Sequence, residues 1–296
     1  MGIEHISSEP AKDDGHVRGL DSIEVGGIKL YGVTRGGVET CLMAPDLGVM
    51  FDIGMVPPGA LKADRVLVSH AHADHMAGIH YLLAQRTLHR LGRVEIYMPA
   101  EAVEDVETIL AAWARLEGPD ARPYDFRITG VTPGKPWPIS VDLNARPLRS
   151  THRVPSIAWQ IERLSRRLRP DLVGAPREKI IAARDAGEDI NIRHAEPILC
   201  VSGDTQIELW DQNPDLMRCK VLVHEVTSWG DTPNTETTRM WGHTHVEEII
   251  SRCEQFEGEA LVLVHRSMRH SRGEAERVVR ERFPASVRDK VHVFGH

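Results

Sequence analysis

The chain has 296 residues, 41% of them hydrophobic, and a formal net charge of −7 at pH 7. This length suits one large domain or two small ones, and no apolar run approaches the roughly 18 residues of a membrane helix. The polar N-terminus has no signal-peptide pattern, so we expect a soluble, cytoplasmic protein without membrane contact. The four cysteines are too scattered for a disulfide framework or a structural zinc knuckle (Cys41, Cys200, Cys219 and Cys253).

The predicted elements alternate short strands with helices. Residues 1–20 are polar and aperiodic and are expected to form an N-terminal arm, whereas 21–296 are expected to form a single domain. Residues 23–53 show short β-like runs separated by glycine and proline turns. A compact apolar strand over 65–68 precedes a helix predicted over 75–91. Then come a strand, a helix, further strands and two helical pieces (94–98, 102–115, 121–150, 205–219 and 243–256).

Three short apolar strands each end at a polar residue of a ligand type. Strands that are apolar on both faces are covered on both sides, and ligand sites in layered α/β proteins gather at strand ends. The sequence therefore predicts an α/β fold in which helices enclose the sheets, with a site where these strands end. The segments 66–69, 198–203 and 261–264 lead to His70, Asp204 and His265.

The strongest chemical signal is the run His70-Ala71-His72-Ala73-Asp74-His75. In extended backbone, residues i and i+2 point the same way, so His70 and His72 can reach one metal ion. Asp74 and His75 stand at the entry to the predicted helix and face a second metal position. Neutral imidazole and carboxylate suit zinc and related divalent ions, manganese and iron included.

One cluster cannot complete two metal shells, so the sequence must supply distant ligands. The candidates are the lone His152, Asp204 within Gly-Asp-Thr, and His265 at the end of its strand. This ordered series resembles the metallo-β-lactamase superfamily, and more narrowly its ribonuclease Z branch, the tRNA 3′-processing endonucleases. The match runs from about residue 23 to the C-terminus and is similar to the short form of that enzyme. Its further motifs are Glu39-Thr40-Cys41, Phe51-Asp52-Ile53-Gly54, His224-Glu225-Val226-Thr227, Gly242-His243-Thr244-His245 and His265-Arg266-Ser267-Met268-Arg269.

The resemblance implies the metallo-β-lactamase fold, an αββα four-layer sandwich of two mixed β-sheets covered by helices. It also implies two zinc ions per chain, with manganese or iron as alternatives, that convert a bridging water to hydroxide for attack on a phosphodiester. Relatives in this branch suggest a homodimer in which the arm of one subunit serves the active site of the other. By motif, His70, His72 and His152 would hold one ion, Asp74, His75 and His265 the other, and Asp204 would bridge both.

The resemblance implies catalytic roles as well. His243 matches an extra histidine of the family and would protonate the departing 3′-oxygen as general acid. Glu225 would orient His243, and Asp74 would orient or deprotonate the attacking water. His245 matches less well and is interpreted as structural.

The substrate contacts depart from the family pattern in two places. Ser267 and Arg269 resemble phosphate-contacting residues, but His270 stands where the family has tyrosine. The interval from His152 to Asp204 holds only 52 residues where the family inserts a flexible arm that grips tRNA. The basic insert over about 163–184, with seven basic residues against two acidic ones, is either a shortened arm or a lid for a smaller anion.

Two functional hypotheses keep the same metals. One is an endonuclease acting on precursor tRNA, and the other is a hydrolase of a small cyclic nucleotide, aryl sulfate or thioester. His243 with Glu225 favours phosphodiesters, whereas the short insert and the net charge of −7 favour a small substrate. A true β-lactamase is disfavoured because no cysteine ligand is present, and an oxygen-reducing diiron enzyme because His72 replaces glutamate. A non-catalytic scaffold would lack a ligand or His243, and neither is lacking.

Overall fold

The computed structural model describes residues 20–295. The polar arm expected over 1–20 therefore lies, apart from residue 20, outside the described residues. None of the helices formed by 20–295 combines the length and apolar character that crossing a bilayer requires.

The first sheet has seven strands in sequence order, β1 to β7. Its first four strands pair antiparallel, and β4 through β7 pair parallel. The parallel half carries the connection from β5 into the histidine cluster. The bounds are β1 (Asp21–Val25), β2 (Ile28–Arg35), β3 (Glu39–Ala44), β4 (Val49–Phe51), β5 (Arg65–Leu67), β6 (Val94–Pro99) and β7 (Phe126–Val131).

The second sheet also has seven strands, in the order β14-β13-β12-β11-β10-β9-β8. Strands β11 to β14 pair parallel, and β8 to β11 pair antiparallel. The carboxyl ends of β11, β12 and β13 thus lie together at one edge of this sheet. The bounds are β8 (Trp137–Pro138), β9 (Leu143–Arg149), β10 (Ile157–Leu168), β11 (Asn191–Val201), β12 (Val221–Glu225), β13 (Ala260–Val264) and β14 (Val291–Val293).

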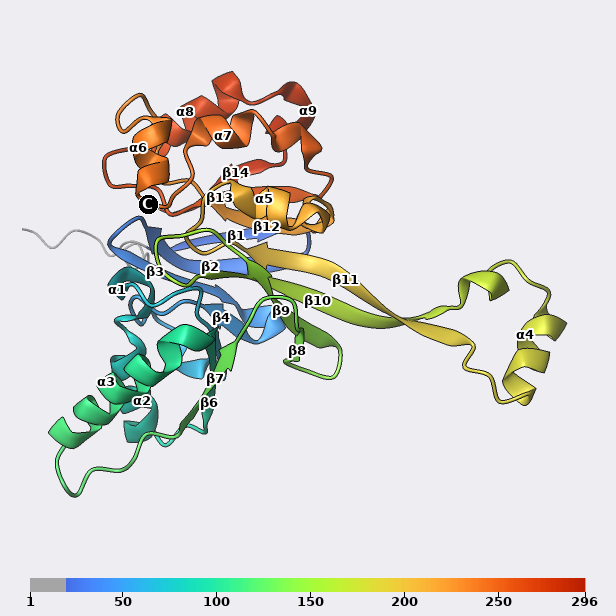
Figure 1. Ribbon diagram of the computed structural model, residues 1–296, viewed down its shortest axis with the longest axis horizontal. Helices are drawn as coiled ribbons and strands as arrows, with labels where there is room; N and C mark the ends of the chain where they lie inside the picture. Colours follow the sequence, from blue (N-terminus) through green and yellow to red (C-terminus); the bar gives the residue numbers. More distant parts are fainter. Residues whose placement is uncertain (1–19, 296) are drawn as a thin grey trace, which may run out of the picture.

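The two sheets pack face to face and helices cover both outer faces (Figure 1). Between the sheets lies a core with Phe51 and Leu67 from one sheet and Trp159 and Val262 from the other. A second apolar cluster joins the first sheet to its helices, and a third does so for the second sheet. The predicted αββα four-layer fold is confirmed. The helices are α1 (Ala73–Met76), α2 (Ile79–Leu88), α3 (Val103–Leu116), α4 (Arg177–Asp185), α5 (Glu208–Gln212), α6 (Thr235–Met240), α7 (Val246–Ile250), α8 (Arg272–Arg282) and α9 (Ala285–Arg288).

The helix predicted over 75–91 is wrong in one respect, because it is two helices. α1 ends at Met76 and α2 begins at Ile79. Gly78 lies between them, where a β-carbon would come 2.8 Å from the carbonyl oxygen of Ile53. The close approach of the β4 exit to this turn explains both the glycine and the break. The pieces over 205–219 and 243–256 are shorter than predicted, since each ends in a 3₁₀ turn (Pro214–Arg218 and Cys253–Gln255).

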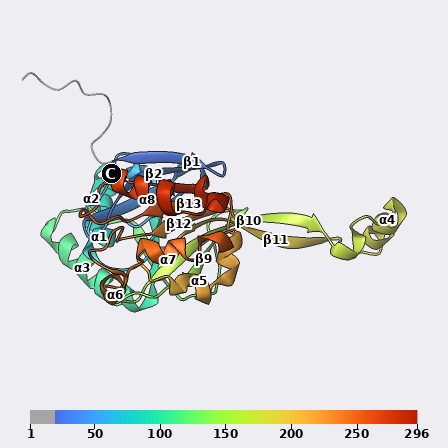
Figure 2. The ribbon, with the colours of Figure 1, turned by 90° about the horizontal axis from the view of Figure 1, so that it is seen from above.

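The basic insert lies in an arm that projects from the body of the molecule. β10 and β11 continue past the sheet as a two-stranded ribbon, with a 3₁₀ turn (Pro170–Leu172) and α4 at its far end. In two perpendicular views α4 and α1 lie at opposite ends of the molecule (Figures 1 and 2). The insert therefore does not cover the histidine cluster of its own chain.

Candidate metal centre

The carboxyl end of β5 and the loop that follows it position the predicted ligands of the histidine motif. β5 leads through Ser69 to His70, and α1 begins at Ala73 with extended backbone at His72. Asp74 lies in the first turn of α1, and the imidazole of His75 is buried on the inner side. This strand-to-helix turn brings four ligand-type side chains to the edge where the two sheets meet.

The seven predicted ligands form two adjacent clusters. The ligand atoms within each cluster lie within 4.8 Å of one another, and Asp204 belongs to both. One cluster holds His70, His72, His152 and Asp204, and the other holds Asp74, His75, Asp204 and His265.

The buried nitrogen and oxygen atoms at the centre are arranged to bind a pair of cations rather than to hydrogen-bond with one another. Asp204 Oδ1 is buried without a hydrogen-bond partner among the described residues, although the Nε2 atoms of His75 and His265 each lie 3.2 Å from it. The donor nitrogens of His70 and His72 also converge, with Nε2 of one 3.0 Å from Nδ1 of the other. Lone pairs that point at a common centre are the arrangement that a metal ion requires. The clusters are consistent with a dinuclear metal site.

The charge states of His70 and Asp204 suit metal ligation, whereas His75 would have to release a proton. Burial alone would lower the pKa of His75, but the carboxylates of Asp204 and Asp52 outweigh burial and raise that pKa well above its usual value. Burial lowers the pKa of His70 well below its usual value, which keeps the imidazole neutral. Burial alone would raise the pKa of Asp204, but the surrounding histidines, His265 foremost, hold that pKa well below its ordinary range. Neutral imidazole and ionised carboxylate are the forms that bind divalent cations.

Asp52 orients one ligand and was not predicted as a site residue. Its carboxylate accepts hydrogen bonds from the backbone N–H of Ser69 at 2.6 Å and from the Ser69 hydroxyl at 2.9 Å. Oδ2 of Asp52 also lies 2.8 Å from Nδ1 of His75. Because the carboxylate can only accept, Nδ1 of His75 carries a proton, which leaves Nε2 as the nitrogen that would bind a metal. The available sequence signal was the position of Asp52 directly after β4.

Two further ligands have fixed ring orientations. The Thr227 hydroxyl donates to Glu225 Oε2 at 2.9 Å and lies 3.1 Å from Nδ1 of His265. Since the hydroxyl has one proton, it accepts from Nδ1–H of His265, which leaves Nε2 as the nitrogen of that ring that faces the metal position. Nδ1 of His152 lies 2.8 Å from the carbonyl oxygen of Gly242, with the same consequence. Thr227 and Gly242 were not predicted as orienting groups.

His243 stands beside both clusters with its own carboxylate. Its Nδ1 lies 2.9 Å from Oε1 of Glu225, which is buried. Burial lowers the pKa of His243, but the charge and hydrogen bond of Glu225 outweigh burial and raise the pKa to about 9. The ring of His243 is stacked 5.4 Å from the ring of His265. The site thus contains a protonated imidazole next to the predicted metal position.

The remaining predicted residues lie at the rim. Ser267 is buried and Arg269 is exposed, with NH1 of Arg269 3.4 Å from the Ser267 hydroxyl. His270 is half-buried, and Nε2 of its ring has no hydrogen-bond partner among residues 20–295. His245 caps α7, and its ring nitrogens contact the Gly230 carbonyl and the backbone N–H of the helix, in line with a structural role.

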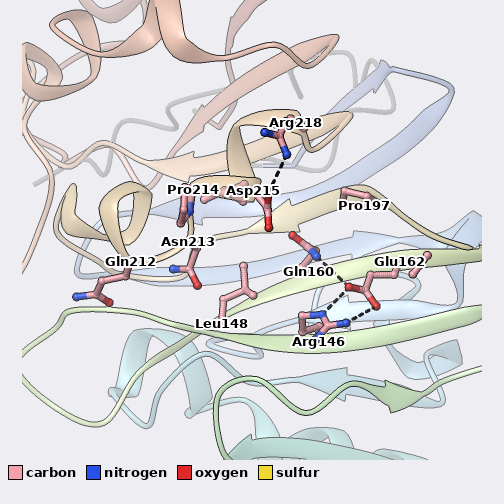
Figure 3. Close-up of a pocket in the computed structure, with 12 residues that line it drawn as sticks. Arg146, Leu148, Gln160, Glu162, Pro197, Gln212, Asn213, Pro214, Asp215 and Arg218 are labelled. Atoms are coloured by element: carbon pink, nitrogen blue, oxygen red, sulfur yellow. Dashed lines mark hydrogen bonds and ion pairs between the residues drawn. The ribbon is translucent and has the colours of Figure 1, made fainter.

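A hollow of about 610 Å³ lies on the outer face of β9, β10 and β11, apart from the histidines (Figure 3). Its charged groups neutralise one another, since Arg146 pairs with Glu162 at 2.5 Å and Arg218 with Asp215 at 2.8 Å. None of the predicted site residues lines it. The hollow therefore adds nothing to the chemistry of the metal centre.

Known proteins resemble this chain in sequence and in fold. Residues 54–181 match the family model of the beta-lactamase superfamily domain. A tRNase Z of Arabidopsis thaliana is 29% identical over 260 residues, which are 87% of this chain and 92% of that protein. A nuclear ribonuclease Z of Triticum aestivum is 30% identical over 168 residues, or 57% of this chain and 94% of that protein. The short form of human tRNase Z superposes with a TM-score of 0.57 at 13% identity, covering 93% of this chain and 96% of that one.

The sequence relatives show the family, and the solved structure shows the fold. The Triticum protein is matched over nearly its whole length, and the human structure shares the fold. Together with the two His/Asp clusters, these similarities indicate a metal-dependent hydrolase related to ribonuclease Z. The chain belongs to the metallo-β-lactamase superfamily, in its ribonuclease Z branch.

Proposed function

We propose that this protein is a two-zinc phosphodiesterase that cleaves the 3′ extension of precursor tRNA. The observation that carries the proposal is the His243–Glu225 pair at 2.9 Å beside the double His/Asp cluster. A pair of metal ions alone serves many hydrolytic reactions, whereas an added proton donor is suited to a poor leaving group such as an alkoxide. The similarity to a tRNase Z of Arabidopsis thaliana supports tRNA as the substrate.

The zinc ligands are those of the two clusters. Two zinc ions there would supply Lewis acidity at the phosphate and an activated water. Burial alone would raise the pKa of Asp74, but the neighbouring His265 and His75 outweigh burial and lower that pKa to about 2 in the metal-free protein. The ionised carboxylate can therefore accept a hydrogen bond from the attacking water and orient it. His70, His72 and His152 would hold one ion, Asp74, His75 and His265 would hold the other, and Asp204 would be shared, in line with the two clusters.

His243 delivers the proton to the departing 3′-oxygen. In the imidazolium form Nδ1–H donates to Glu225, which leaves Nε2–H for the substrate. Glu225 is itself fixed by the backbone N–H groups of Thr205 at 3.2 Å and Thr244 at 3.1 Å. A positioned acid of this kind contributes about 10²–10⁴-fold to the rate.

The arm and the rim grip the RNA backbone. In the ribbon Arg166 lies directly opposite Arg193, and both are exposed. Like charges in opposite positions of a β-ladder destabilise it, and a bound phosphate would relieve that repulsion. Ser267 and Arg269 contact the phosphate nearer the metals. The arm points away from its own metal centre, and we infer that it serves the metal centre of a partner subunit in a homodimer.

The test is cleavage of a 3′-extended precursor tRNA by the zinc-reconstituted protein, with bis(p-nitrophenyl) phosphate in the same buffer. A single cut after the discriminator nucleotide supports the proposal. Turnover of the small diester alone would keep the two-metal chemistry and move the natural substrate to a smaller diester. The absence of both activities in protein with two bound metals would refute the proposed function.

A further inference from the structure

Trp241 and Arg269 form a stack at the rim of the metal centre. The guanidinium of Arg269 lies over the indole of Trp241, 5.6 Å from the ring centroid. Trp241 is half-buried and Arg269 is exposed, so the stack is reachable from solvent. An arginine over a tryptophan face is an attractive pair, and it preserves a flat surface for another ring.

The stack joins the two loops that carry the chemistry. Trp241 precedes Gly242, whose carbonyl orients the ligand His152, and stands two residues from His243. Arg269 follows the ligand His265 in the next loop. A group resting on this stack would therefore lie beside a phosphate held at the metals.

The surroundings of the stack are apolar and unusually exposed. Met240 and Met268, the neighbours of the two stacked residues, are 70% and 63% exposed. No carboxylate forms an ion pair with Arg269 among residues 20–295, and its one side-chain contact with a hydroxyl, that of Ser267, is long at 3.4 Å. Exposed thioethers and a guanidinium that pairs with no carboxylate of residues 20–295 are suited, together with the indole, to an aromatic group carried on an anion.

We propose that Trp241 and Arg269 form a stacking platform for one nucleobase next to the scissile phosphodiester. This rests on the proposed function and adds to it a contact for the nucleoside beside the scissile phosphodiester. Every base has a π-face, so the platform binds bases without reading their sequence. The metal ions would act on the phosphate, and the platform would hold the adjoining nucleoside.

The test compares two diesters that share one leaving group. The substrates are thymidine 5′-(p-nitrophenyl) phosphate and methyl p-nitrophenyl phosphate, and the readout is the ratio of their KM values with zinc-loaded protein. Trp241→Ala should reduce the preference for the thymidine ester about tenfold through KM rather than kcat. Trp241→Phe should restore most of the preference. Arg269→Lys, which keeps the charge and loses the planar group, should reduce it as well.

The matched control is Trp113→Ala. Trp113 is also partly buried and stacked, on His80 with ring centroids 4.5 Å apart, but it lies in α3 on the helix layer of the first sheet. That variant should keep the wild-type preference. An unchanged preference in Trp241→Ala, or an equal loss in Trp113→Ala, would overturn the platform.

A failure of the proposed function is distinguishable from a failure of the platform. If neither diester is hydrolysed, calorimetry can compare binding of thymidine 5′-monophosphate with binding of inorganic phosphate. Tighter binding of the nucleotide that is lost in Trp241→Ala and kept in Trp241→Phe supports the platform without any turnover. Equal affinities for the two ligands in the wild-type protein would overturn it.

Discussion

The metal centre and the arm are built on opposite principles. At the centre, His70 and Asp204 are buried, and the orienting side chains Asp52 and Glu225 are buried as well. In the arm, α4 has no buried side chain, and Arg166 and Arg193 of the ribbon are exposed. The centre is held by a network of hydrogen bonds, whereas the arm is held by one antiparallel ribbon.

This contrast matches the different needs of a reaction centre, whose side chains must be held in place, and of a charged binding surface, which can move. Reacting groups gain most from a geometry that is set before the substrate arrives. A surface that binds a phosphate backbone gains from charge and tolerates movement, because the attraction has little directional requirement. Substitutions in the two regions should therefore differ in size and in kind.

The largest effect is expected from Asp204→Ala, which removes the carboxylate shared by both clusters. Two groups of imidazoles, of which His70, His75 and His265 are buried, would then face each other without the anion between them. Metal content should therefore fall below two per chain and turnover to background. Elemental analysis and diester hydrolysis measure the two outcomes. Retention of two metals per folded chain would refute the shared role.

Next in size is His243→Ala, which should slow phosphodiester cleavage by about 10²–10⁴-fold with the metal content unchanged. The reason is that His243 lies outside the seven ligands and contacts Glu225 instead. His89→Ala, at an exposed position after α2, is the control and should behave as wild type. Unchanged turnover in His243→Ala would exclude it as the proton donor.

The centre could be predicted from the sequence to the extent that its chemistry is local. The spacing of His70 and His72 and the strand-end positions of Asp204 and His265 follow from short-range geometry. The structure brings these residues together with His152. Asp52 and Thr227 could not be assigned roles, because their partners His75 and His265 are 23 and 38 residues away.

The arm and α8 were less predictable for a different reason. The outer part of β10, with three arginines and no regular alternation, carries no burial pattern because it packs against no core. In α8 only Ala275 and Val279 are buried, so a helix of mostly charged residues shows too little apolar periodicity to be recognised. Helices and strands that bury few apolar side chains show little hydrophobic periodicity and are therefore hard to predict from sequence.

A smaller effect is expected from a substitution at Asp52, which tests how much the hydrogen bonds around the predicted ligands contribute to metal affinity. Asp52→Asn keeps the size of the side chain but replaces an acceptor of the His75 Nδ1–H with an amide. We expect metal affinity to weaken about 10–100-fold, measured by competition with a chelator. Asp46→Asn is a matched control, since Asp46 is exposed in the turn between β3 and β4. An unchanged affinity in Asp52→Asn would show that the metal shell is fixed without this carboxylate.

The smallest effect is expected in the arm, from Arg166→Gln. Each phosphate contact adds about one to the slope of the logarithm of the binding constant against the logarithm of the salt concentration. Losing one contact should therefore weaken RNA binding about fivefold at physiological salt and lower this slope by about one. Filter binding of precursor tRNA across a salt series measures both quantities. Arg122→Gln, at an exposed arginine after α3, is the control. Equal affinity and slope in both variants would remove the ribbon from the RNA interface, and the repulsion between Arg166 and Arg193 would then need another explanation.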